Sequence, residues 1–346
     1  MDLQRLHEIT NRYSGLSIAL LGDFCLDRYL EIDPARQETS LETGLSVHNV
    51  VRVRAQPGAA GTVLNNLVAL GVGRIIPLGF AGDDGEGFEL GRALRAMPGV
   101  RCESFLQTPL RRTFTYCKPL LVEAGQPPRE LNRLDSKNWT PTPAEVEDQV
   151  IAAIQRQAGH IDALAIMDQV DLADTGVLTR RVLHAVGEFA ARHPGLRILA
   201  DSRRSLRGYP PVSLKMNRAE LGMLLGGPPP AAAAQTQRAA LELARRNGRD
   251  VFVTLAEEGL LAASPKGETV HLAALPIRGP IDIVGAGDAV TANLTAALAA
   301  GATLCEALEL ANAAASVVIH QLGTTGAASA GQIAEMMADA TGGANV

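Results

Sequence analysis

The segment of this sequence best suited to chemistry is Asp282–Ala300, which reads DIVGAGDAVTANLTAALAA. Gly285, Ala286 and Gly287 stand at the start of a helical pattern, and Asp288 falls in its first turn. Small residues at a helix start leave backbone N–H groups open to a ligand, and the helix dipole favours an anion there. A carboxylate beside that anion can take the proton of an attacking hydroxyl. The pattern predicts phosphoryl transfer with Asp288 as base, although a capping aspartate after a tight turn would explain the same residues.

Two further segments carry polar residues directly after predicted strands. Asp23 and Asp27 follow the first strand, where ligands of open α/β sheets bind, and two acids there could grip sugar hydroxyls. Asn217 and Glu220 stand three residues apart in KMNRAE, so both could face one metal–phosphate group. Each pair also has a simpler explanation. The aspartates would be a turn residue and a solvent-facing acid, and Asn217 would cap a helix.

Basic residues gather in two places where they could bind the phosphate of a substrate or of a nucleotide. The alternative for both groups is a solvated edge, which protects an exposed strand from aggregation. The residues are Arg111, Arg112, Lys118 and Arg133 in one segment, and Arg203, Arg204 and Arg207 in the other.

Short apolar runs alternate with longer amphipathic segments along most of the chain. The runs predicted to be buried strands are 17–21, 75–80, 163–167, 197–200, 212–216 and 251–255. Helical patterns cover 62–70, the stretch that carries Leu90, Leu94 and Met97, 144–158, 175–193 and 231–247. This alternation is typical of an α/β protein with a mostly parallel central sheet flanked by helices.

Two stretches, 28–55 and 108–123, break this rhythm because they alternate in the β manner and contain no obvious helix. Two strand-rich insertions in an α/β chain predict a small β-sheet that stands off the main body as a lid. We therefore expect a single domain over residues 1–346 with these insertions as its lid.

Composition limits the classes of protein that fit. The 346 residues are 47% hydrophobic and 20% charged, which suits a large core and excludes a disordered chain. The net charge of −5 argues against a protein built to coat nucleic acid. No apolar run is long enough for a membrane span or a signal peptide. The four cysteines are scattered, which favours a reducing, cytoplasmic location over disulfides or zinc.

Several enzyme classes lack their motifs here. The sequence has no GxxxxGK[ST] loop of a P-loop kinase and no GxGxxG fingerprint of a dinucleotide-binding dehydrogenase. It has no GxSxG nucleophile elbow, and its seven histidines are dispersed without metal-ligand spacing. Phosphoryl transfer outside the P-loop class remains the chemistry that the motifs indicate.

The motifs together resemble the ribokinase or phosphofructokinase-B (PfkB) family of carbohydrate kinases. DIVGAGD resembles its C-terminal signature, and PGAAGTVLNNLVALG at 57–71 resembles its N-terminal PGGAANVALNLAALG motif without gaps. TLAEEG at 254–259 and ANAAASVVIHQLGT at 311–324 are similar to its nucleotide-side segments. GDFCLDRY at 22–29 and LNRLD at 131–135 look most like the members that phosphorylate heptose 7-phosphate. The resemblance covers nearly the whole chain in order.

The resemblance implies a ribokinase-like fold and a kinase that uses ATP and Mg²⁺. It implies that the lid, over 28–55 and 108–135, covers the sugar and serves as a homodimer interface. Its implied base is Asp288, with Gly285, Ala286 and Gly287 as anion hole. The implied ATP-side residues are Asn217, Glu220 (with an indirect role toward Mg²⁺), Thr254, Gly259 and Asn312, and the implied sugar-side residues are Asp23, Asp27, Gly58, Thr62 and Asp135.

Four departures from the family pattern concern substrate more than reaction. Ala59 replaces the second glycine of the PGG motif and Thr62 replaces an asparagine that contacts sugar, where a hydroxyl cannot reproduce the geometry of an amide. Ala256 replaces a glycine beside the nucleotide. Ile283 and Val284 fill the middle of the signature where a threonine is usual, which leaves a monovalent-cation requirement open.

Two classes of function stay open on the sequence. The first is an ATP-dependent sugar kinase, with a sugar phosphate of the heptose 7-phosphate type as leading acceptor and a nucleoside or an unphosphorylated sugar as the alternative. The second is a non-catalytic member of the same fold that binds a sugar or a nucleotide. Asp288 discriminates between them, because a binding protein needs no base at its anion hole.

Overall fold

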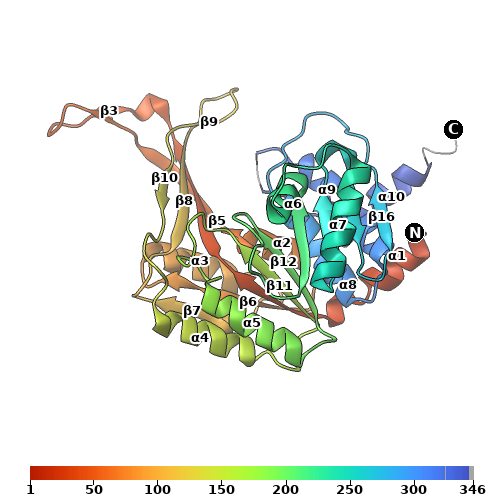
Figure 1. Cartoon of the computed structure of the whole chain (residues 1–346). Coiled ribbons are helices and arrows are strands. Elements are labelled where there is room, and N and C mark those ends of the chain that lie inside the picture. The colour runs from red at the N-terminus through yellow and green to blue at the C-terminus, as the bar shows by residue number, and fades with distance from the viewer. Residues whose placement is uncertain (324, 343–346) are drawn as a thin grey trace.

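A nine-stranded sheet forms the centre of the molecule in this computed structural model, which describes residues 1–323 and 325–342 (Figure 1). The strands lie in the order β16-β15-β14-β13-β12-β11-β1-β6-β7, and every pairing is parallel except the two that involve β15. The expected α/β architecture is confirmed. The strands are β1 (Ser17–Gly22), β6 (Arg74–Gly82), β7 (Phe105–Thr108), β11 (Ala163–Asp168), β12 (Arg197–Ser202), β13 (Ser213–Asn217), β14 (Val251–Thr254), β15 (Leu260–Ala263) and β16 (Thr269–Leu272).

The sheet is buried on both faces, which explains why its strands are nearly continuous apolar runs. In β1, Ile18 and Leu20 pack into one hydrophobic cluster, while Ala19 and Leu21 pack into another on the opposite face. The first cluster joins α1 (Leu3–Thr10), α2 (Ala60–Ala69), α3 (Gly85–Arg95), α8 (Ala286–Ala299), α9 (Leu304–Ile319) and α10 (Ala330–Gly342). The second joins α4 (Ala144–Gln155), α5 (Arg180–Arg192), α6 (Arg218–Leu225) and α7 (Ala233–Asn247).

A smaller five-stranded sheet projects from one side of the main body (Figure 1). Its order is β10-β8-β2-β5, with β9 paired to β8, and a short β3–β4 hairpin extends from it. This sheet is the lid expected from the two β-type insertions, although its strands begin earlier and end later than those ranges. They are β2 (Phe24–Ile32), β5 (Val50–Ala59), β8 (Phe114–Leu121), β9 (Arg129–Glu130) and β10 (Leu134–Ser136), with β3 (Glu38–Thr39) and β4 (Ser46–Val47).

Several elements differ from the sequence prediction. The helix expected from residue 175 begins at Arg180, because Thr179 caps it through a hydrogen bond from the Val182 amide. The β15–β16 hairpin and α6 were not predicted, since both are short. Their patterns are shorter than the windows in which periodicity is recognisable.

Ala59, which stands where the family pattern has glycine, holds a backbone conformation that favours glycine, with φ 55° and ψ −119°. A non-glycine residue in this region carries roughly 1–3 kcal/mol of strain. We expect Ala59→Gly to stabilise the protein by about 1 kcal/mol after the added entropy of the unfolded chain is subtracted. Thermal unfolding should show a rise of about 1–2 °C. A lower melting temperature would contradict the strain.

Candidate active site

The start of α8 presents open backbone amides, as the small residues of its motif predicted. Gly285 precedes the helix with φ 85°, a left-handed conformation, and no side chain of residues 1–323 and 325–342 caps the helix. The Ala286 amide already donates to the Ile283 carbonyl at 3.2 Å. Among the described residues, the amides of Gly285, Gly287 and Asp288 have no acceptor. Open amides therefore stand on both sides of the engaged Ala286 amide.

The carboxyl group of Asp288 lies recessed in the first turn of α8. Burial raises the pKa of Asp288 to about 7, and Lys215 acts in the opposite direction. The carboxylates of Asp201 and Asp27 also raise this pKa, while Arg203 lowers it. A carboxyl with a pKa near neutrality is well matched to general-base work at physiological pH.

Lys215 belongs to the KMNRAE segment, but the sequence predicted no role for it. From β13 its side chain reaches the start of α8. Its ammonium nitrogen lies 2.6 Å from an Asp201 carboxylate oxygen, and both residues are buried. The Thr291 hydroxyl donates to the same oxygen at 3.0 Å, which ties this pair to α8. A Cβ at Gly287 would lie 3.2 Å from the Lys215 ammonium, so the glycine lets this cation approach the open amides. Burial alone would lower the pKa of Lys215, but Asp201 outweighs it and raises this pKa.

A cavity of about 540 Å³ opens on one side of the α8 start. It has the size of a nucleotide site. The sequence-predicted residues that line it are Asn217, Thr254, Gly259, Ala286, Gly287 and Asn312. Gly259 has φ 92°, and a Cβ there would meet the Leu272 carbonyl oxygen at 2.0 Å, so only glycine fits. Six residues chosen from four separate motifs thus surround one cavity.

The rest of this cavity was not predicted. Leu275, Ile277, Ile281 and Ile283 supply an apolar wall suited to a flat heterocycle. All four lie in the irregular segment between β16 and α8, where no periodic pattern marks them. Arg218 and Glu258 pair at 2.7 Å beside the cavity.

Asn217 and Glu220 form a reciprocal capping box at the start of α6. The Asn217 side chain accepts from the Glu220 amide at 2.9 Å, and the Glu220 carboxylate accepts from the Asn217 amide at 2.7 Å. The capping explanation therefore describes their present contacts, and Asn217 alone lines the cavity. Burial raises the pKa of Glu220.

The oxygen donors of these two residues fit Mg²⁺ that is held mainly by nucleotide phosphates. Mg²⁺ prefers oxygen ligands and commonly takes one or two carboxylates in addition to substrate phosphates. Among the described residues, no group of three or more His, Cys, Asp or Glu side chains could hold a metal by itself. An indirect role for Glu220 agrees with both points.

Asp27 and Gly58 lie close together on the paired strands β2 and β5. Asp27 is 6% exposed, so it is not a solvent-facing acid. A Cβ at Gly58 would lie 2.5 Å from an Asp27 carboxylate oxygen and 2.8 Å from the Cys25 sulfur. The Lys118 ammonium, from β8 of the lid, lies 4.0 Å from the Asp27 carboxylate. Burial raises the pKa of Asp27, and Lys118 opposes this effect.

Asp23 has a different arrangement from the one predicted. Its buried carboxylate accepts hydrogen bonds from the backbone amides of Gln169, Val170 and Val177, at 2.9, 3.3 and 2.7 Å. These contacts fasten the loop that follows β11 to the end of β1. Burial and the nearby carboxylate of Asp168 raise the pKa of Asp23.

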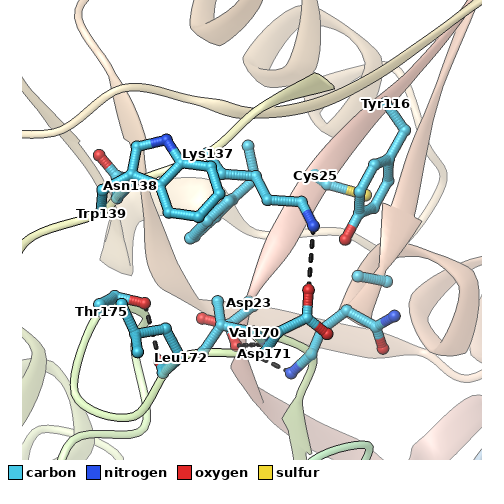
Figure 2. Close-up of a pocket in the computed structure, with 13 residues that line it drawn as sticks. Asp23, Cys25, Tyr116, Lys137, Asn138, Trp139, Val170, Asp171, Leu172 and Thr175 are labelled. Carbon is cyan, nitrogen blue, oxygen red and sulfur yellow. Dashed lines mark hydrogen bonds and ion pairs between the residues drawn. The ribbon is translucent and has the colours of Figure 1, made fainter. Parts of the chain in front are cut away.

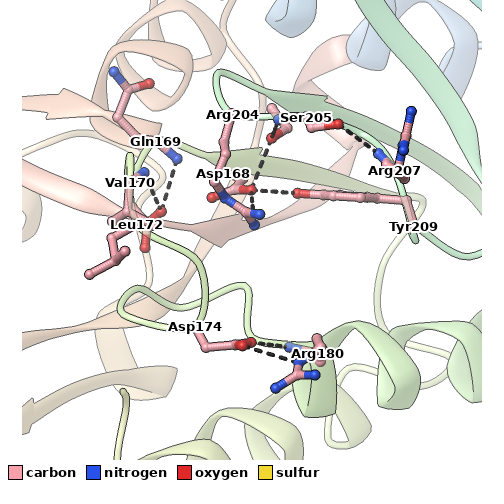
Figure 3. Close-up of polar contacts among 12 residues, drawn as sticks. Asp168, Gln169, Val170, Leu172, Asp174, Arg180, Arg204, Ser205, Arg207 and Tyr209 are labelled. Atoms are coloured by element: carbon pink, nitrogen blue, oxygen red, sulfur yellow. Dashed lines mark hydrogen bonds and ion pairs between the residues drawn. The ribbon is translucent and has the colours of Figure 1, made fainter. Parts of the chain in front are cut away.

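Asp168 anchors the other end of the same region (Figure 3). One of its oxygens accepts from Ser202, Arg204 and the Tyr209 hydroxyl, at 2.9, 3.2 and 3.1 Å. Arg204 therefore serves the scaffold beneath the site. Arg207 likewise donates to the Met223 carbonyl.

The remaining predicted residues divide between the site and the scaffold. Thr62 is 2% exposed within α2, and Asp135 lies on the lid, paired with Arg133 at 2.6 Å.

Arg111 is neither a phosphate ligand nor a solvated edge, which corrects both expectations. It is 6% exposed and donates to the carbonyls of Thr140 and Thr175 at 3.0 and 2.7 Å.

Comparison with known proteins identifies the family of the chain. Residues 24–330 match the pfkB family of carbohydrate kinases. The chain belongs to this family. A carbohydrate kinase family is what the resemblance implied. No helix in the part of the chain that the structure describes is long and apolar enough to cross a membrane.

Two curated relatives are both named bifunctional protein HldE. The one from Trichlorobacter lovleyi is 32% identical over 330 residues, which cover 94% of this chain and 64% of that protein. The one from Gluconacetobacter diazotrophicus is 32% identical over 336 residues, 96% of this chain and 66% of that protein. The chain thus spans about two thirds of the length of these relatives.

Two solved structures share the fold. Phosphofructokinase-2 from Escherichia coli in complex with fructose-6-phosphate superposes with a TM-score of 0.69 at 19% identity, over 94% of this chain and 99% of that chain. Ribokinase from Arabidopsis thaliana, complexed with ribose and ATP, has a TM-score of 0.64 at 17% identity, over 93% and 98%. The ribokinase-like fold expected from the motifs is confirmed.

Proposed function

We propose that this protein transfers the γ-phosphoryl group of ATP to a hydroxyl of a sugar phosphate, with Asp288 as general base. One observation carries the proposal. Ala286 and Gly287, which directly precede Asp288, line a nucleotide-sized cavity, and the Asp288 carboxyl is also close enough to Asp27 for that carboxylate to raise its pKa. A base between a donor site and an acceptor site is the arrangement that phosphoryl transfer requires.

The chain's own residues divide the reaction among them. Asp288 takes the proton of the acceptor hydroxyl. The oxygen of that hydroxyl bonds to the γ-phosphorus while the bond from the γ-phosphorus to the bridging β-phosphate oxygen breaks. The Gly287 and Asp288 amides stabilise negative charge on the transferring group. Lys215, held in place by Asp201, adds a positive charge beside these amides. Bound Mg²⁺ would neutralise phosphate charge, with Glu220 and Asn217 orienting it.

We infer that the acceptor resembles heptose 7-phosphate. The relatives that the chain matches over nearly its full length are HldE proteins, and the GDFCLDRY and LNRLD segments resemble heptose phosphate kinases. Lys118 from the lid lies beside Asp27 and supplies one cation at the acceptor site. The fructose-6-phosphate in the phosphofructokinase-2 structure belongs to that enzyme and supports only the class of acceptor.

Two other functions compete with this one. A nucleoside or an unphosphorylated sugar would use the same Asp288 and differ only in the acceptor pocket. A non-catalytic binding protein would explain the altered residues Ala59, Thr62 and Ala256. The retained Asp288, with its pKa near 7, favours the enzyme.

Release of ADP, measured with Mg-ATP against a panel of sugars, sugar phosphates and nucleosides, separates these possibilities. We expect heptose 7-phosphate to give the highest kcat/KM and free sugars to be poor acceptors. If only nucleosides were phosphorylated, the acceptor would be a nucleoside and not a sugar phosphate. Saturable binding of ATP or sugar without turnover on any acceptor would favour the binding protein.

We further propose that the lid mediates a homodimer, in a cytoplasmic protein whose four cysteines stay reduced. Large apolar side chains are exposed on the lid, among them Val51 at 50%, Val53 at 48% and Leu134 at 65%. We expect wild-type protein to sediment as a dimer and Val51→Asp/Val53→Asp to sediment as a monomer. A monomeric wild type, or a doubly substituted protein that stays dimeric, would contradict the interface.

A further inference from the structure

The lysines of this chain are few and unevenly placed. The sequence contains four, Lys118, Lys137, Lys215 and Lys266. Lys215 lies beside the anion-binding amides and Lys118 beside Asp27, whereas Lys266 lies in the turn between β15 and β16. The proposed mechanism uses neither Lys137 nor Lys266, and of these two only Lys137, just after the last lid strand, lines a pocket between the lid and the main sheet.

Lys137 lines a small pocket between the lid and the main sheet (Figure 2). Its ammonium nitrogen lies 2.9 Å from the Asp171 carboxylate and 5.8 Å from the centre of the Tyr116 ring. Trp139, the single tryptophan of the chain, lines the same pocket and is 74% exposed. In Figure 2 the Lys137 ammonium lies between the Trp139 and Tyr116 rings and points to Asp171.

This pocket continues from the acceptor site. Cys25 lines it, and the same sulfur lies against Gly58, which faces Asp27. The pKa of the Cys25 thiol is raised by burial and also responds to Asp27 and to Asp288. An acceptor with its reacting hydroxyl at Asp288 and Asp27 would therefore extend its far end past Cys25 toward Lys137.

The charges at that end suit an anion. Two cations, Lys137 and Arg203, act on Asp171 and lower its pKa. Asp23 also lines the pocket, but its carboxylate is already held by three backbone amides. The Asp171 side chain is 66% exposed, and exposed ion pairs contribute little to stability. A dianionic group can therefore displace Asp171 from Lys137 at small cost.

We propose that Lys137, with Trp139 beside it, is the specificity subsite for an anionic phosphate at the end of the acceptor remote from the reacting hydroxyl. The phosphate replaces Asp171 as the partner of Lys137, and the Trp139 ring packs against C–H groups of the acceptor. This inference rests on the proposed sugar phosphate kinase and assigns the selection of the phosphorylated form to one side chain.

The single tryptophan allows a direct binding test without ATP. Emission of Trp139 is followed while heptose 7-phosphate, free heptose, fructose 6-phosphate and free fructose are titrated separately into the wild type, Lys137→Met and the matched control Lys266→Met. We expect saturable changes with the sugar phosphates at concentrations about tenfold lower than with the free sugars. Lys137→Met should lose this preference, and Lys266→Met should keep it.

Turnover assays on the same proteins separate the two claims. If Lys137→Met keeps the full preference for the phosphorylated form, or if acceptors that turn over leave Trp139 emission unchanged, the subsite is overturned while the kinase stands. If sugar phosphates bind with the predicted dependence on Lys137 but are never phosphorylated, the subsite stands and the proposed function falls.

Discussion

Asp288→Asn is expected to lower kcat by about 10²–10⁴-fold, because an amide cannot take a proton from the acceptor hydroxyl. Nucleotide binding should be unchanged or slightly tighter, since a negative charge beside the phosphates is removed. Steady-state kinetics with the best acceptor of the panel gives the first number, and calorimetric titration with a non-hydrolysable ATP analogue gives the second.

Asp282→Asn is the matched control for this substitution. Asp282 lies in the same motif, and its carboxylate accepts from the Val284 amide, a contact that an asparagine oxygen can keep. We expect this variant to retain most activity. Equal losses in both variants would mean that Asp288 acts through the fold of the segment and would contradict its assignment as base.

Lys215→Met is expected to have the second large effect, on both stability and pH dependence. Removing one partner leaves the buried Asp201 carboxylate unpaired, at a cost of about 3–5 kcal/mol in the free energy of unfolding. Lys215 also lowers the pKa of Asp288 against the effect of burial. The wild type should therefore lose activity as the pH falls through about 7, and the variant should lose it at a higher pH.

A double variant, Lys215→Met with Asp201→Asn, separates these two effects. It removes the unpaired carboxylate, so much of the stability should return. It also removes the negative charge of Asp201, which raises the pKa of Asp288. The pH at which activity is lost should therefore move part of the way back to the wild-type value. If kcat/KM of Lys215→Met fell at the same acidic pH as that of the wild type, Lys215 would have no effect on the pKa of Asp288, which would contradict the prediction.

The fold could be predicted because its signals are local and repeated. Each central strand is an apolar run buried on both faces, as Ile18 and Ala19 illustrate, and each helix carries a periodic apolar face. The glycine turn before α8 could also be predicted, since the left-handed backbone conformation of Gly285 favours glycine. The structure adds that Ala59 and Ala256, where the family pattern has glycine, both have positive φ.

The partners of individual charges could not be predicted, because they come from distant parts of the chain. Lys215 and Asp201 lie on neighbouring strands, and Thr291 reaches them from α8. No spacing rule links these three positions. Asp23 shows the same limit, since a carboxylate that binds three amides of a loop some 150 residues away looks in sequence like any acid after a strand.

Arg111 and Arg112 show why a cluster of cations in the sequence is a weak guide. The two residues are adjacent, yet Arg111 is buried against backbone carbonyls while Arg112 is exposed and donates to the Ser136 hydroxyl at 3.1 Å. Successive residues of an extended chain point to opposite sides, so neighbours in sequence need not share an environment. Lys137, which the sequence did not single out, has the more favourable position for an anion.

The most direct test of the central claim follows the phosphorus atoms themselves. In ³¹P NMR of the wild type with Mg-ATP and heptose 7-phosphate, the account predicts that a second phosphomonoester signal grows on the sugar in step with ADP. The same mixture with Asp288→Asn should remain nearly unchanged. ADP that accumulates with inorganic phosphate and no new sugar signal, or equal transfer by Asp288→Asn, would contradict a sugar phosphate kinase that uses Asp288 as its base.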